Sequence, residues 1–453
     1  MADYSYNNMK ETPWCYMPPE MHFESVMDLC DAFWKFQLSR IQDELENLQM
    51  AEYLLPPANK FEKECGMCMD SYGLFFELLQ VALGEKAVLS RTPSAEEWQK
   101  LYSLATKQAV TGITMSALEI LSVQRQKPPM GILYEWIGVT EQIRLANQQL
   151  TKYCKQLQQI LDKNGLRSSI LKGQGIARLY NLNDNLNLDG ERQFRLLRQP
   201  GDIDVYVDCG REKAIQLAHN LGQEHVEWDY KHLHLKIFPD TEVEVHYRVE
   251  VLLNLWKNRK LQKWFCEHQD AMFNLDDNLN LKANNTNSTN GLITPSVEFN
   301  VFYILLHIYR HFLYEGVGLR QIVDYYFVLK KFNLDVDLNL NESYAYKAVH
   351  EFGMEKFAKG LMWVMHEALG MPREWMLWEP DEKEGRYILK QVMMGGNFGH
   401  HDMRLNHSEG KLGAVQAILT HNMHLLTHYP SDVFWAPIWI VWHKLWKLTR
   451  RKI

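Results

Sequence analysis

Two aspartates that flank a single isoleucine are the strongest chemical signal in this sequence. Asp202 and Asp204 follow a Pro-Gly turn and begin a run in which polar and apolar residues alternate up to Val207. Such a run predicts a β-strand with both carboxylates on one face, because alternate residues of a strand share a face. Carboxylates that start roughly 6.5 Å apart can bracket two divalent cations about 3.5–4 Å apart, and all-oxygen ligands favour Mg²⁺.

A second alternating run can supply a third acid to the same site. Residues 241–250 place Glu242, Glu244, His246 and Arg248 on one face of a strand, opposite apolar residues. The expected role of His246 is to hydrogen-bond a carboxylate or to orient a ligand, with direct catalysis as the alternative.

A glycine-containing turn upstream is a candidate phosphate-binding segment. Residues 170–177 run from an apolar strand through Lys172-Gly173-Gln174-Gly175 into an expected helix. Backbone N–H groups at such a turn, together with one lysine, are suited to hold phosphate oxygens.

In this order, the three segments resemble the nucleotidyltransferase superfamily that includes DNA polymerase β and the aminoglycoside nucleotidyltransferases. The closer resemblance is to a bacterial family known as uncharacterised nucleotidyltransferases. That family reads Lys-Gly, then Arg-x-x-Gly-Asp-Ile-Asp, then acid-apolar-His. The matching positions here are Lys172-Gly173, Arg198 with residues 201–204, and residues 244–246. The resemblance covers about residues 98–329.

This resemblance implies an α+β fold in which a small mixed β-sheet of the polymerase β type is flanked by N- and C-terminal helical regions. The implied enzyme depends on Mg²⁺: an acceptor oxygen attacks the α-phosphorus of an NTP, and pyrophosphate leaves. The acceptor is left open, since a sugar, a small metabolite, a protein hydroxyl or an RNA end would each suit the chemistry.

The resemblance also implies roles for individual residues. Asp202, Asp204 and Glu244 are implied as catalytic residues that bind two Mg²⁺ ions, with Glu242 as the substitute because Glu244 stands where a third Asp is common. The implied nucleotide-binding residues are Lys172, Gly173, Gly175, Arg198 and Gly201. Within this set, Lys172 and Arg198 are the candidates for phosphate charge, and Gly173 is expected beside the triphosphate.

Two pairs of residues downstream are expected to line a substrate cleft together with His246. His307 and His311 share a helix face at metal-ligand spacing, but their apolar neighbours favour packed, hydrogen-bonded histidines. Arg320 and Asp324 also share a helix face, where a salt bridge is the commonest explanation and contact with substrate is the alternative.

Helical and mixed segments alternate along the chain, and the candidate site falls in the mixed segment. Apolar periodicity predicts helices over about 21–121, 132–163, 295–331 and 345–369. Asn-rich stretches at 181–190, 274–291 and 333–341 are predicted as surface insertions. We therefore expect a helical N-terminal region (1–94), a helical region leading into the core (95–165), an α/β core (166–251), a helical C-terminal domain with an insertion at about 274–291 (252–430), and a Trp-rich basic tail (431–453).

The composition excludes several classes of protein. An apolar content of 46 % excludes global disorder, and a net charge of −7 gives no basic excess for a nucleic-acid backbone. The N-terminal residues show no secretory signal, so the cytoplasm is the expected location. Seven scattered cysteines predict no disulfide framework, and the isolated Cys65-x-x-Cys68 motif is interpreted as coincidence.

The tail separates two hypotheses for the role of the protein. Its aromatic and basic residues suit packing on the protein's own helices, which is the preferred interpretation, or contact with a membrane surface or a protein partner. The alternative to an enzyme is therefore a non-catalytic protein that keeps the fold and docks through this tail. A phosphohydrolase built on His307, His311 and Asp324 fits less well, because the only His-Asp dipeptide is His401-Asp402.

Overall fold

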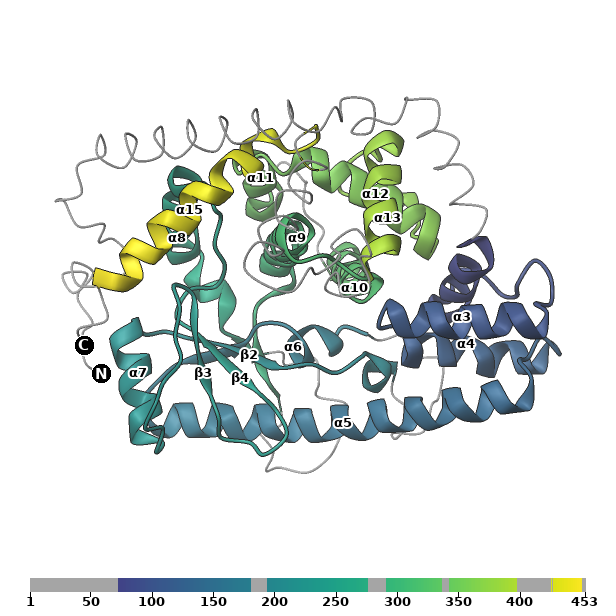
Figure 1. Cartoon of the computed structure of the whole chain (residues 1–453), viewed down its shortest axis with the longest axis horizontal. Coiled ribbons are helices and arrows are strands. Elements are labelled where there is room, and N and C mark those ends of the chain that lie inside the picture. The colour runs from purple at the N-terminus through teal and green to yellow at the C-terminus, as the bar shows by residue number, and fades with distance from the viewer. Residues whose placement is uncertain are drawn as a thin grey trace, which may run out of the picture.

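The computed structural model describes residues 72–180, 194–275, 291–335, 342–396, 425 and 427–449. Its centre is a four-stranded sheet with helices around it, so the α+β class predicted from the sequence is confirmed (Figure 1). In chain order the strands are β1 (Ser168–Ile170), β2 (Ile203–Val207), β3 (His232–Leu235) and β4 (Val243–His246).

The sheet is mixed, and its strand order is β1-β2-β4-β3. β2 runs antiparallel to β1 and parallel to β4, and β3 and β4 form an antiparallel hairpin. The parallel pairing sets Asp204 directly opposite Glu244, and the hairpin sets His234 opposite Glu244 from the other side. Three strands therefore bring polar residues to one region of the sheet.

The two faces of the sheet differ sharply in polarity. Alternate residues of β2, β3 and β4 pack with α5 (Met130–Lys163) and α7 (Arg211–Asn220) in one apolar cluster. The strand residues in this cluster are Ile203, Val205, Val207, Leu233, Leu235, Val243 and Val245. The residues between them, which include Asp204, Glu244 and His246, must face the other way because the side-chain period of a strand is two.

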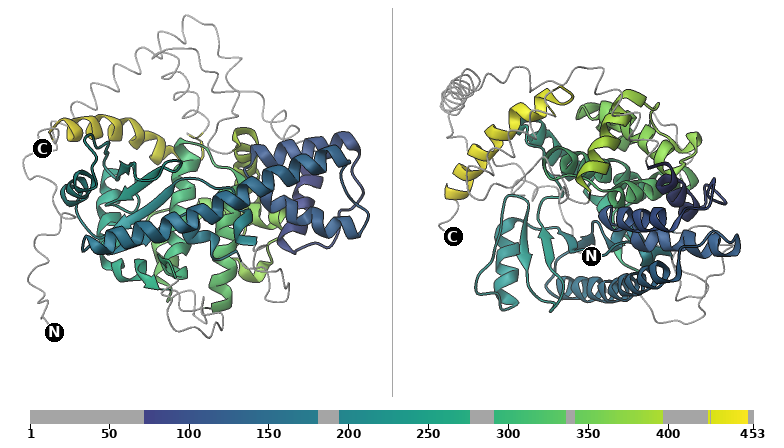
Figure 2. Two further views of the ribbon diagram at one scale, coloured as in Figure 1. Left: turned by 90° about the horizontal axis from the view of Figure 1, so that it is seen from below. Right: turned by 45° about the vertical axis from the view of Figure 1, so that its right-hand side comes forward.

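Helix α5 links the sheet to the N-terminal helices α3 (Ala95–Lys107) and α4 (Thr111–Val123), as Figures 1 and 2 show. It ends at Lys163, with Asn164 as the C-cap, and the following Gly165 has φ of +70°, a left-handed conformation that glycine adopts at little cost. The predicted end of this helix is confirmed.

Further helices lie on the side of the sheet opposite α5 (Figure 1). The central one is α9 (Val297–Tyr314), which is buried on nearly every side. The others are α8 (Leu255–Glu267), α10 (Leu319–Asp335), α11 (Tyr344–Glu351), α12 (Glu355–Leu369) and α13 (Glu382–Gly395). One apolar cluster joins these helices to residues of α3 and α4.

Two of the predicted Asn-rich insertions begin later than the sequence suggested. Asn274 and Leu275 form strand β5 (Asn274–Leu275), which pairs with β6 (Ile293–Thr294), and α10 continues to Asp335. At the end of α10, Asn333 donates hydrogen bonds to the carbonyls of Leu329 and Trp375, which explains why the helix includes it. The structure does not describe residues 1–71 with the Cys65-x-x-Cys68 motif, the insertion residues 181–190, 276–290 and 336–341, or His401-Asp402.

The Trp-rich tail forms helix α15 (Pro430–Thr449), which packs on the protein itself. Trp439, Trp442 and Trp446 surround the ring of Tyr230 with ring centroids 5.0–5.3 Å away, all edge-on. The preferred interpretation of internal packing is therefore confirmed for these residues. Among the described helices, none combines the length and apolar character that crossing a membrane requires.

Gly175 offers a test of the packing between β1 and α6 (Gln174–Ala177). A Cβ atom at this position would lie 2.4 Å from the backbone carbonyl oxygen of Ile170. We expect Gly175→Ala to lower the free energy of unfolding by about 1–3 kcal/mol, because a backbone atom cannot rotate away from the clash. Urea denaturation provides the measurement.

The matched control is Gly138→Ala on the exposed surface of α5, where a Cβ atom meets nothing within 4 Å. This change should stabilise the helix by up to about 1 kcal/mol. Equal stability of the two variants would contradict the close approach of Gly175 to Ile170.

Candidate active site

A cavity of about 360 Å³ lies between the polar face of the sheet, α9, α10 and α15. Most of the residues predicted from the sequence line it. They are Lys172, Gly173, Arg198, Gly201, Asp202, Asp204, Glu244, His307, His311, Arg320 and Asp324. Gly175 and His246 are not in the lining; Gly175 packs on Ile170, and His246 lies fully buried behind the carboxylates.

Asp204 and Glu244 form the centre of the site, and two basic side chains hold them. Lys172 Nζ lies 2.8 Å from Asp204 Oδ1. His246 Nε2 lies 2.9 Å from the same oxygen and 3.2 Å from Glu244 Oε2. The expectation that His246 hydrogen-bonds a carboxylate is confirmed, and its contact with both acids fixes their relative position.

At this centre, charge interactions lower the pKa values of the carboxyl groups by more than burial raises them. Burial alone would raise the pKa of Asp204, but Lys172 and His246 lower it well below its usual range. Burial likewise opposes ionisation of Glu244, whereas His246 and Lys172 lower its pKa. Both groups are therefore carboxylates at neutral pH, as ligands of a hard cation must be.

Asp202 lies one residue before β2 and is more exposed than Asp204. The negative charge of Asp204, and then burial, raise the pKa of Asp202 to about 6. Asp202 lines the cavity beside Asp204, so two acids meet there. This arrangement concentrates negative charge where a cation can approach from the cavity.

The residues present fit a divalent metal ion. One ligand atom each from Asp204, Glu244 and His246 lie within 4.8 Å of one another, and Asp202 adds another carboxylate from the same strand end. Carboxylate oxygens are the preferred ligands of Mg²⁺. Glu242, the expected substitute, does not line the cavity and instead lies 2.7 Å from His234 Nδ1.

Arg198 is held by an acid that is distant in the sequence. Its Nε and Nη2 atoms donate to the two carboxylate oxygens of Asp324 at 2.7 and 2.8 Å, and Tyr180 donates to the same carboxylate at 2.6 Å. The sequence suggested Arg320 as the partner of Asp324, since four residues separate them on α10. Arg198 was not foreseen as a partner because 126 residues separate the two.

The wall formed by α9 is built around the buried carboxylate of Glu250. His307 Nδ1, Arg310 Nε and Lys231 Nζ lie 3.2, 3.1 and 3.5 Å from its oxygens. His311 Nδ1 lies 2.7 Å from Glu315 Oε2. Each histidine is therefore buried beside an acidic partner, as expected of packed, hydrogen-bonded histidines.

Two glycines let the backbone approach the cavity. Gly173 has φ of +55°, a conformation that a residue with a Cβ atom rarely adopts. Gly201 lies close to Arg320, whose Nη1 atom would be 3.5 Å from a Cβ added at this glycine. Arg320 also donates a 3.4 Å hydrogen bond to the carbonyl of Pro200, and so braces the turn before Asp202.

Sequence reasoning missed several residues of the cavity wall. Tyr230, Lys231 and His232 come from the start of the hairpin, and Trp439 and His443 come from α15. The alternation of His232 and His234 along a predicted strand was an available signal. No pattern in the sequence pointed from α15 to the site, because their proximity depends on the tertiary fold.

Comparison with known proteins identifies one related family. The family model described as "Uncharacterised nucleotidyltransferase" matches residues 94–370. No curated protein and no solved structure matches the chain significantly. The matched segment contains every predicted site residue, from Lys172 to Asp324.

Breaking the buried ion pair between Arg198 and Asp324 should strongly destabilise the fold. Asp324→Asn should lower the free energy of unfolding by about 3–5 kcal/mol, because it leaves the buried guanidinium without its counter-charge. Urea denaturation measures this loss. As a control, Glu141→Gln breaks the exposed 2.8 Å pair with Arg144 and should cost at most about 1 kcal/mol. Similar losses in the two variants would contradict a buried pair.

The lowered pKa of Glu250 should make the stability of the fold depend on pH. Burial would raise its pKa, but Lys231, Arg310 and His307 hold the pKa well below the ordinary value of 4.5. Its ionised form therefore stabilises the fold fully above pH 4.5, and this contribution is lost as the pH falls further.

The test compares wild type with Glu250→Gln across pH. The difference in unfolding free energy should be about 3–5 kcal/mol at neutral pH and should narrow below pH 4.5. A difference that stays constant down to acid pH would contradict the ion cluster.

Proposed function

The chain belongs to the family of uncharacterised nucleotidyltransferases, and from this premise we propose that it transfers a nucleoside monophosphate from an NTP to an acceptor. A bond forms between an acceptor oxygen and the α-phosphorus, and the bond from that phosphorus to the pyrophosphate group breaks. The observation that carries the proposal is the in-register pairing of Asp204 with Glu244 beside Asp202, at the wall of one cavity.

Asp202, Asp204 and Glu244 are the residues proposed to hold Mg²⁺, as two ions. When bound, Mg²⁺ would act as a Lewis acid toward phosphoryl oxygens and the attacking oxygen. His246 contributes by orienting two of the carboxylates from behind, at 2.9 and 3.2 Å. Residues that orient ligands in this way are positioning residues, and their loss weakens metal sites.

The nucleotide is proposed to lie along the turn that follows β1. Lys172 and Gly173 line the cavity next to Asp204, and Gly201 lines it from the turn before Asp202. Lys172 supplies positive charge for phosphate oxygens, since its carboxylate neighbours raise its pKa despite burial. Arg198 supports this wall while its guanidinium is bound to Asp324.

The acceptor is proposed to enter from the side of the helices. His307, His311 and Arg320 line that side, together with Trp439 and His443 of α15. In this arrangement the helical regions flank an α/β core of the polymerase β type, with domain boundaries as expected from the sequence. The mixed sheet with acids on neighbouring parallel strands supports this arrangement.

One observation favours a second candidate function. Helix α15 exposes the apolar residues Ile440 and Leu448, which a partner protein or a membrane surface would be able to contact. A non-catalytic protein with this fold would use such a contact and would not need metal-dependent binding of NTP.

Loss of either aspartate should abolish nucleotide transfer. We expect Asp202→Asn and Asp204→Asn each to reduce transfer by at least about 100-fold. Loss of a residue that only hydrogen-bonds a metal ligand costs about 10–100-fold in activity, and loss of the ligand itself should cost more. The measurement incubates the protein with labelled NTPs, Mg²⁺ and a cell extract, and identifies the molecule that acquires label.

The control is Asp208→Asn, which changes an acid just after the other end of β2, outside the cavity. It should leave transfer intact. Full transfer by both Asp202→Asn and Asp204→Asn would overturn the catalytic assignment. Absence of Mg²⁺-dependent binding of every NTP in isothermal titration would instead support the non-catalytic candidate.

A further inference from the structure

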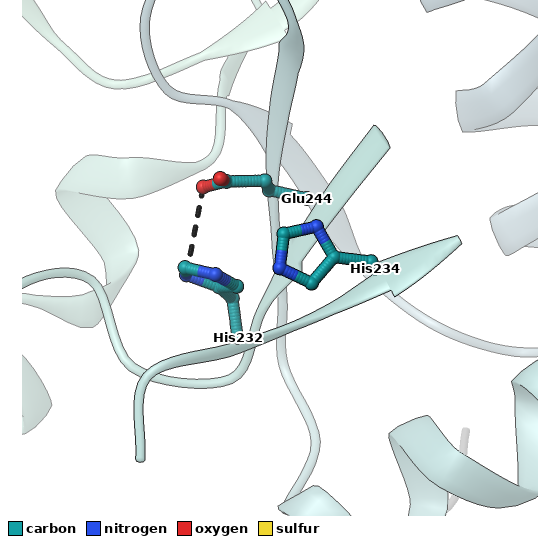
Figure 3. Close-up of side chains that lie close together, drawn as sticks. All are labelled: His232, His234 and Glu244. Atoms are coloured by element: carbon teal, nitrogen blue, oxygen red, sulfur yellow. Dashed lines mark ion pairs between the residues drawn. The ribbon is translucent and has the colours of Figure 1, made fainter. Parts of the chain in front are cut away.

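Strand β3 carries two histidines toward Glu244, on the side of this acid away from Asp204. His232 and His234 alternate along β3, so both face the polar side of the sheet, and His234 is the direct cross-strand partner of Glu244. Figure 3 shows the two imidazole rings beside the Glu244 carboxylate. One ligand atom from each of the three residues lies within 4.8 Å of the others.

The contacts leave one ring nitrogen of each histidine for a ligand. His232 Nδ1 is buried without a hydrogen-bond partner among the described residues, and it lies 3.5 Å from Glu244 Oε2. His232 Nε2 lies on the side of Asp229, 3.8 Å from its Oδ2. His234 Nδ1 is likewise buried without a hydrogen-bond partner among the described residues, although it lies 2.7 Å from Glu242 Oε1.

This donor set has a chemistry different from that of the carboxylate centre. Two imidazoles and one carboxylate are ligands typical of Zn²⁺ and related transition metals, whereas Mg²⁺ prefers oxygen ligands alone. An acid also lies near each histidine, since Asp229 Oδ2 is 3.8 Å from His232 Nε2 and Glu242 Oε1 is 2.7 Å from His234 Nδ1. Carboxylates near ligating histidines help to fix imidazole orientation at metal sites.

We propose that His232, His234 and Glu244 form a second metal site, which takes a transition-metal ion of the Zn²⁺ class. Three protein ligands would leave a coordination position for water or another ligand, and His232 and Glu244 both line the cavity. The site shares only Glu244 with the proposed Mg²⁺ set. The proposal concerns metal binding alone and does not depend on nucleotide transfer.

Co²⁺ is a suitable probe, because its visible absorption becomes intense when it is bound by nitrogen and oxygen ligands in tetrahedral geometry. Full-length protein treated with a chelator and dialysed is titrated with Co²⁺ in the absence of nucleotide. We expect one Co²⁺ per chain with such a band. His232→Ala and His234→Ala should each weaken Co²⁺ binding by at least about tenfold. Even residues that only hydrogen-bond a metal ligand contribute about tenfold or more to metal affinity.

Two control variants locate the bound ion. Asp204→Asn should keep the band, because Asp204 is not part of the histidine cluster. His350→Ala should also keep it, since His350 lies in an exposed pair with Glu355 that represents surface histidines. Circular dichroism tests whether each variant is folded. If an alanine variant does not fold, the corresponding His→Gln variant is used in its place.

The outcomes separate this proposal from the proposed function. Absence of a band in wild type would overturn the proposed site, and so would a band that survives both histidine substitutions. A band lost in Asp204→Asn but kept in the two histidine variants would place the ion at the carboxylate centre, which overturns this proposal and leaves nucleotide transfer standing. Failure of nucleotide transfer alone would leave the histidine site unaffected.

Discussion

The parallel pairing of β2 with β4 is the constraint on which the candidate site depends. Because Asp204 and Glu244 are register partners, their side chains leave the same face of the sheet as direct neighbours. Two adjacent carboxylates repel each other, and the fold offsets this repulsion with Lys172 and His246. A shift of one residue in register would send one of the acids to the apolar face against α5.

Buried ion pairs also connect the sheet region with the helices that cover it. Glu250, which follows β4, is bound by His307 and Arg310 of α9, and Arg198, which precedes β2, is bound by Asp324 of α10. Taking such charges out of water is costly unless their geometry is good, so these pairs tolerate few arrangements of the two regions. They thereby set the distance between the carboxylates and the helical wall.

Local patterns predicted the parts of the structure that local interactions determine. The end of α5 before Gly165 and the two-faced run around Asp204 follow from glycine conformation and strand periodicity. Contacts between distant segments could not be predicted in this way. The partner of Arg198 is 126 residues away, and the approach of α15 to the hairpin depends on how whole elements pack. The two histidines of β3 were visible as alternating residues, but only the order of the strands puts them beside Glu244.

The place of α15 in the cavity wall means that two separate stretches of the chain build the candidate site. The acids belong to the segment shared with the family, whereas Trp439 and His443 lie beyond its matched end at residue 370. One stretch of polypeptide therefore supplies the acids of the cavity, and a separate stretch supplies another part of its wall. Under the proposed function, substitutions in α15 would change this part of the wall and would leave the acids of the sheet in place.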